Sequence, residues 1–134
     1  MNCGVSLRLL ALSLALALTN CGGRNDCLVV LLDVGPESGI ADHSAPPPGN
    51  AQQFLAIGEF AGSCAVPAVF PPMQDVTWSV SDTAHVTISN TRDITFGTAT
   101  CLNATSGPVD VTATLPANKN FGRTVSATGK LTCN

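Results

Sequence analysis

The sequence predicts an all-β domain, an antiparallel sandwich of about seven strands, preceded by a signal peptide. About seven short runs of alternating apolar and polar residues follow one another after residue 26, and each is bounded by Gly, Pro, Asn or Asp. No run with the period of an α-helix separates them, which favours a sandwich over a parallel βαβ arrangement. Thr and Val are abundant in the C-terminal half, and both favour strands. A closed barrel is the alternative architecture.

Residues 1–20 have the pattern of an export signal. Arg8 precedes about ten almost wholly apolar residues, Leu9 to Leu18. This run is too short to cross a bilayer, which takes about 20 residues. A helix that is apolar on every side also makes a poor element of a small core. We therefore expect residues 1–20 to be a signal peptide that is removed on export.

The residues around the expected cleavage site resemble the lipobox of bacterial lipoproteins. Leu18 stands three positions before Cys21, as in that family, while Asn20 stands where the family usually has a small residue. The resemblance implies that Cys21 becomes the mature N-terminus and carries lipid. The polar composition of residues 21–26 predicts a short tether between the anchor and the domain. The alternative is ordinary cleavage after the Ala-x-Ala sequence at 15–17, which would release a soluble protein.

The first strand is predicted over residues 27–34. This run is rich in Leu and Val and is stopped by Gly35-Pro36, a pair that breaks regular structure. Residues 37–50 are predicted to form a loop, because the three consecutive prolines at 46–48 cannot donate to a strand ladder. The whole segment from 27 to 134 is expected to be one domain, since it is long enough for a single core.

The second strand is predicted over residues 53–60. Alternation places Phe54 and Phe60 on one face, with Ala56 and Gly58 between them, and we predict that this face is buried in the core. A second proline-rich loop follows over residues 61–74.

The clearest strand is predicted over residues 76–81, where period two is unbroken. Trp78 is in phase with Val76 and Val80, so we predict a core tryptophan rather than an exposed platform for sugar stacking. The remaining runs have the same alternation between turn residues. They predict strands over 86–90, 94–104, 109–115 and 124–133.

Four of these segments together resemble the bacterial immunoglobulin-like domain family, group 2. They are Gln53-Phe54-x-Ala56-x-Gly58-x-Phe60, Asp75-Val-Thr-Trp-Ser-Val-Ser-Asp82, Val86-Thr-Ile-Ser-Asn90 and Val109-Asp-Val-Thr-Ala-Thr114. The resemblance covers about residues 28–134 and implies an immunoglobulin-like sandwich. It also implies a surface or periplasmic module of the kind found in adhesins, stalks and carbohydrate-associated proteins, without catalytic activity. The long proline-rich loop at 61–74 and the cysteines are departures from the family pattern.

Four cysteines remain if Cys3 leaves with the signal peptide and Cys21 is acylated, and they are Cys27, Cys64, Cys101 and Cys133. In an exported chain four such cysteines indicate two disulfides, and their spacing leaves three pairings open. A zinc site is the competing interpretation, but zinc ligands usually come in closely spaced pairs, which these cysteines do not form. The topology that the family resemblance implies places Cys27 and Cys64 at one pole and Cys101 and Cys133 at the other. We therefore prefer the pairs 27–64 and 101–133.

The sequence contains no recognisable catalytic constellation, metal motif or cofactor motif. Its two histidines lie in loop contexts, and the neighbouring Asp42 and His43 are expected to be a solvated pair rather than a base with its orienter. Turn formation accounts for Asp75, Asp82 and Asp93 better than calcium binding does, because no Asp-x-Asp-x-Asp-Gly run is present. The net charge of −3 lacks the basic footprint of a nucleic-acid-binding protein.

We therefore expect a non-catalytic lipoprotein of the bacterial cell envelope, held at the membrane through its lipid. Its expected role is structural, adhesive or carbohydrate-associated, with a protein or carbohydrate ligand that the sequence does not define. The two proline-rich loops, 37–50 and 61–74, are the expected recognition surfaces, because loops on a rigid scaffold carry most binding functions. A secreted soluble binding domain is the alternative.

Overall fold

The computed structural model describes residues 27–62, 64 and 72–134, and this part of the chain is all-β. The expected signal peptide, Cys21 and the tether 21–26 lie outside the described residues, as do residues 65–71 of the second proline-rich loop. No helix in the described ranges is long and apolar enough to span a membrane. The elements are β1 (Leu28–Gly35), β2 (Ser38–Ala41), β3 (Ala51–Gln53), β4 (Leu55–Ala61), β5 (Thr77–Val80), β6 (Val86–Ile88), β7 (Thr98–Cys101), β8 (Val109–Leu115), the 3₁₀-helix η1 (Ala117–Lys119) and β9 (Val125–Cys133).

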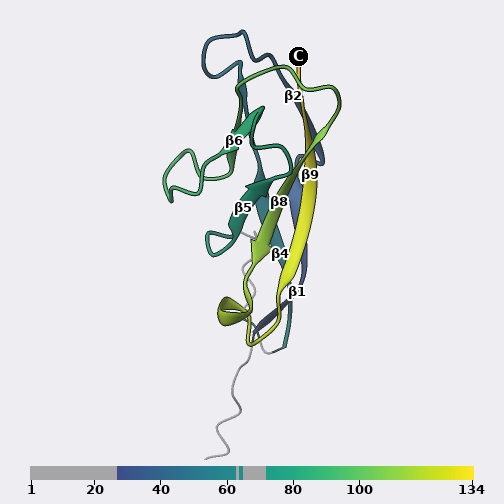
Figure 1. The fold of residues 1–134 in the computed structure, drawn as a ribbon. Helices are drawn as coiled ribbons and strands as arrows, with labels where there is room; N and C mark the ends of the chain where they lie inside the picture. The colour runs from purple at the N-terminus through teal and green to yellow at the C-terminus, as the bar shows by residue number, and fades with distance from the viewer. Residues whose placement is uncertain (1–26, 63, 65–71) are drawn as a thin grey trace, which may run out of the picture.

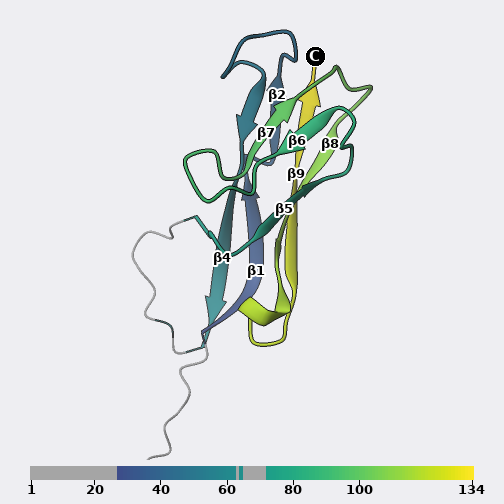
Figure 2. The ribbon, with the colours of Figure 1, turned by 60° about the vertical axis from the view of Figure 1, so that its left-hand side comes forward.

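The strands form an elongated, sandwich-like arrangement with two layers (Figures 1 and 2). One layer is a four-stranded sheet in the order β2-β9-β8-β5, in which β2 pairs with β9 in parallel and the other pairs are antiparallel. The other layer holds two antiparallel sheets, β1-β4 and β3-β7-β6. The C-terminus lies at one end of the long axis, and β1 begins at the opposite end, beside η1 (Figure 1).

At two points the strand pairing changes, so that one continuous run of sequence contributes strands to two different sheets. β1 pairs with β4, whereas β2, which follows the bend at Gly35-Pro36, pairs with β9 in the other layer. The predicted strand 53–60 is likewise divided at Phe54, whose backbone N–H donates to the carbonyl of Gly97 at 2.9 Å. Residues before this point pair with β7, and residues after it pair with β1.

The structure corrects the predicted loop at 37–50, because its first part is the strand β2. The four residues Ser38–Ala41 precede the prolines and pair with the end of β9. Pro46, Pro47 and Pro48 do lie in the loop that follows, outside every strand. The predicted strand 94–104 is also too long, since only Thr98–Cys101 is extended and Ile94 lies 92% exposed in the preceding turn.

Phe54 and Trp78 are buried in the core as predicted, with 0% and 3% of their surface exposed. The prediction for Phe60 is wrong, because this residue is 36% exposed. Inward alternation along β4 holds through Ala56 and Gly58, but Phe60 lies near the end of the strand, opposite Val29 at the start of β1. At this end of the sandwich the side chain is not enclosed by the core. The core between the layers consists mainly of Val29, Leu32, Val34, Phe54, Trp78, Val86, Phe96, Val111, Leu115 and Leu131.

Two asparagine side chains take the place of a neighbouring strand at the edges of the sandwich. The amide of Asn120 accepts from Val29 N–H and donates to Val29 C=O, both at 2.9 Å. Asn90 makes the same pair of bonds to the backbone of Trp78 on β5, at 2.7 and 3.0 Å. Each amide thus satisfies one donor and one acceptor that the strand would otherwise leave open.

Candidate functional site

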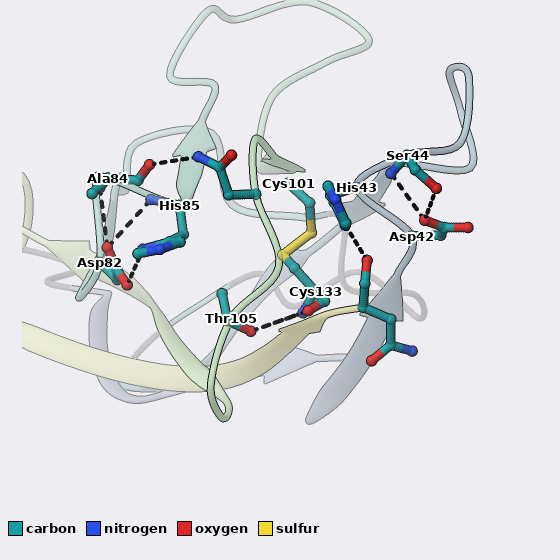
Figure 3. The surroundings of a disulfide bond; sticks show 11 residues. Asp42, His43, Ser44, Asp82, Ala84, His85, Cys101, Thr105 and Cys133 are labelled. Atoms are coloured by element: carbon teal, nitrogen blue, oxygen red, sulfur yellow. Dashed lines mark hydrogen bonds and ion pairs between the residues drawn. A yellow bond between two sulfur atoms is a disulfide. The ribbon is translucent and has the colours of Figure 1, made fainter.

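Three loops and the C-terminus meet at the end of the sandwich that lies farthest from the start of β1 (Figures 1 and 3). The loops are residues 42–50, 81–85 and 102–108, and we call their combined surface the distal pole. The disulfide between Cys101 and Cys133 lies beneath it, with the two cysteines 2% and 1% exposed. This disulfide joins the ends of β7 and β9, which belong to different layers.

Backbone hydrogen bonds hold the distal pole together. Leu102 N–H donates to the carbonyl of His85 at 2.7 Å, which ties the second loop to the third. Thr105 N–H donates to the carbonyl of Cys133 at 2.9 Å, and the Thr105 hydroxyl accepts from Cys133 N–H at 3.0 Å. The first loop is tied to the C-terminus by His43 N–H, which donates to the carbonyl of Asn134 at 3.1 Å. The loops therefore form a cross-linked surface with a fixed shape.

Two aspartates organise the turns of the distal pole. Asp42 accepts from both the backbone N–H and the hydroxyl of Ser44, and these bonds lower the pKa of Asp42 below its usual value. Asp82 accepts from the backbone N–H groups of Ala84 and His85, and its second oxygen lies 2.7 Å from His85 Nδ1. Both arrangements are short-range turns of the kind that aspartate stabilises.

The predicted solvated pair Asp42 and His43 is divided between different partners. Asp42 binds Ser44, whereas His43 Nδ1 contacts the backbone carbonyl of Asn134 (Figure 3). The pairing of His85 with Asp82 was not predicted from the sequence, although the Asp-x-x-His spacing after a strand is a signal that could have indicated it. Both members of this pair are more than a third exposed, so they lie at the surface rather than in a cleft.

A groove of about 380 Å³ opens between β5 and β6, the edge strands of the two layers. The residues that line it include the buried Trp78 and Val86, together with Ser79, Thr83 and Thr87. The indole Nε1 of Trp78 is buried and has no hydrogen-bond partner among the described residues. The ring packs edge-on against Phe96, with the two centroids 6.4 Å apart, which is the setting of a core residue.

The disulfides have the pairing that we preferred, Cys27 with Cys64 and Cys101 with Cys133. All four of these cysteines are therefore oxidised, and none is a thiolate that could bind zinc. Within the described ranges, no group of three or more His, Cys, Asp or Glu side chains is placed to hold a metal ion. The calcium alternative gains no support either, since Asp75 pairs with Arg92 and Asp93 accepts from Thr95.

Of the two predicted recognition loops, the structure describes residues 37–50 in full and residues 61–74 only in part. Residues 42–50 form part of the distal pole and lie beside the C-terminus, to which His43 N–H donates. The second loop, 61–74, and the predicted acylation site Cys21 lie wholly or largely outside the described residues. The distal pole is therefore the candidate binding surface that the structure defines.

No model of a known protein family matches the sequence, and no characterised protein matches it either.

Proposed function

We propose that this chain is a lipid-anchored protein of the bacterial cell envelope whose domain is an immunoglobulin-like module without catalytic activity. The observation that carries the fold part of the proposal is the strand order. An immunoglobulin constant-type sandwich has its strands in the orders A-B-E-D and C-F-G. With β1 as A, β3 and β4 together as B, and β5 to β9 as C to G, the two layers have these orders.

The strand β2 extends this correspondence. It pairs in parallel with the last strand, β9, after the chain has crossed from one layer to the other at Gly35-Pro36. Together with the sequence resemblance, this connectivity supports membership of the bacterial immunoglobulin-like group 2 family. The buried Trp78 on β5 also agrees with the proposal, because immunoglobulin domains have a core tryptophan on strand C.

The two disulfides support a location outside the cytoplasm. Disulfides persist in oxidising compartments and are rare in the cytosol. The Cys101–Cys133 bond is buried between the layers, so it is part of the folded domain rather than a surface modification. This observation agrees with export and does not distinguish an anchored protein from a released one.

The distal pole is the surface that we propose for adhesion or carbohydrate association. An anchor at Cys21 would attach the domain through the start of β1, and the distal pole lies at the other end of the long axis (Figure 1). It would then face away from the membrane. Its hydrogen-bonded loops have the preorganised shape that limits the entropic cost of binding.

Intact mass of the native protein, measured with and without reduction and alkylation, tests the proposal. We expect residues 21–134 plus acyl chains, with four cysteines that alkylate only after reduction. A mass beginning at Leu18 without lipid would reject the anchor and favour the secreted alternative. Binding to cell-surface glycans or proteins is then compared between wild type and the Ser44→Ala/His85→Ala double variant. Equal binding would remove the proposed role from the distal pole.

A further inference from the structure

The connection between β8 and β9 presents an unusual sequence, Lys119-Asn120-Phe121-Gly122-Arg123, which we call the 119–123 loop. Phe121 is 65% exposed, and its backbone has a φ of +50°, in the left-handed region that bulky residues rarely adopt. Lys119 and Arg123 flank it and are both exposed. A strained backbone that holds an aromatic ring in water opposes folding stability, so this side chain calls for a role outside the fold.

The loop has a fixed shape that directs Phe121 outward. Gly122 N–H donates to the carbonyl of Ala117 at 2.8 Å, and Arg123 N–H donates to the carbonyl of Asn120 at 2.9 Å. The side chain of Asn120 points into the protein and binds Val29. Because Asn120 is fixed from the inside, its neighbour Phe121 is held at the surface.

The charges of the loop are unpartnered within the described part of the chain. Four Lys and Arg residues lie in this part, and two of them form ion pairs, Arg92 with Asp75 and Lys130 with Asp110. The other two are Lys119 and Arg123, on either side of Phe121. An exposed aromatic residue between two free cations is the combination that binds the interface of an anionic membrane, where the ring enters the headgroup region and the cations meet the phosphates.

The position of the loop in the fold identifies which membrane it would meet. Asn120 binds Val29, two residues after Cys27, so the loop lies where the chain enters the domain (Figure 2). Six residue steps separate Cys27 from Cys21, and a chain of this length spans at most about 20 Å. If Cys21 carries lipid, the 119–123 loop is therefore within reach of the bilayer that holds the anchor.

We propose that the 119–123 loop docks on the anionic surface of that bilayer and orients the domain with its distal pole outward. The inference rests on the proposed acyl anchor at Cys21. Two signals are needed for a stable and defined membrane attachment, and here the lipid would supply the first and the loop the second. The two free cations hold the ring at the interface, and this second contact gives the domain a defined orientation on the membrane.

The test uses the mature chain, residues 21–134, coupled through the Cys21 thiol to a maleimide lipid, so it does not depend on natural acylation. The vesicles contain phosphatidylcholine with roughly one third phosphatidylglycerol, and brominated lipid serves as quencher. Wild type contains a single tryptophan, the buried Trp78, and provides the baseline. We expect strong quenching of Phe121→Trp and none of Leu102→Trp, a matched exposed position at the distal pole.

Charge variants in the Phe121→Trp background show whether the loop binds the bilayer or is only held near it by the anchor. Lys119→Gln/Arg123→Gln should lower the ratio of docked to undocked domains about 30-fold. Arg92→Gln/Lys130→Gln removes the same charge elsewhere and should leave the quenching unchanged. Equal quenching at positions 121 and 102, or equal effects of the two charge pairs, would overturn the proposal. The anchor itself is judged separately by intact mass, so the two proposals fail independently.

Discussion

Asn120→Ala should destabilise the domain more than any other alanine substitution in the connection between β8 and β9. The amide of Asn120 is 1% exposed and makes two hydrogen bonds of 2.9 Å to the backbone of Val29, which is itself 4% exposed. Alanine would leave one buried N–H and one buried C=O without partners. Each such group costs about 1–3 kcal/mol, so the expected loss is about 2–6 kcal/mol.

This loss is large for a domain of this size, whose free energy of unfolding is expected to be about 5–15 kcal/mol. Urea unfolding followed by the fluorescence of Trp78, the single tryptophan, measures it directly. Asn118→Ala is the matched control, because Asn118 is exposed on η1, and it should change the stability by less than about 0.5 kcal/mol. If Asn120→Ala lowered the free energy of unfolding by no more than Asn118→Ala does, the amide would not be replacing the hydrogen bonds of a neighbouring strand, and the reasoning would be refuted.

Three further substitutions test the same physical account. Asn90→Ala should cost about 1–3 kcal/mol and shift the emission of Trp78 to longer wavelength, as unpaired backbone at the edge of β5 admits water. Gly97→Ala should leave part of the population unfolded already at the start of a thermal melt, because φ is +76° at this position and a Cβ would lie 2.4 Å from a backbone carbonyl oxygen. Ser44→Ala should raise the pKa of Asp42 in carboxyl NMR titrations. Because the pKa of Asp42 is lowered in the folded state, the stability that this carboxylate contributes is present at neutral pH and is lost as the pH falls through its folded-state pKa. An unchanged pKa of Asp42 in Ser44→Ala would contradict the assignment.

The long alternating strands could be predicted from sequence because alternation alone defines their buried face. Residues 109–115 are the clearest case, since the predicted bounds are those of β8 and every second residue from Val109 to Leu115 is buried. The phase of Trp78 was predictable for the same reason. By contrast, β2 has only four residues, Ser38–Ala41, and its single strand partner lies about 90 positions later in the chain, so no local pattern indicates it.

The positions that close the edges were not predictable, because their role arises only in three dimensions. Asn90 follows the strand β6 and Asn120 follows the 3₁₀-helix η1, and nothing in the local sequence shows that either amide will meet a strand edge. Phe60 illustrates the opposite failure. Phe60 is in phase with the buried Ala56 and Gly58, as alternation predicts. Its exposure, however, depends on where the covering layer ends, and the sequence of β4 carries no information about that position.

The edges of the sandwich indicate which surfaces are left for binding. An open edge strand can pair with a strand of another chain, and proteins prevent this with short strands, bulges or covering groups. In this domain β1 has a register shift between Val29 and Leu31 and is capped by Asn120, while β5 is capped by Asn90. Two further edge strands, β2 and β6, are short, with four and three residues. Strand addition from the side is therefore disfavoured along β1, β2, β5 and β6, and the proposed binding surfaces lie instead at the two ends of the long axis.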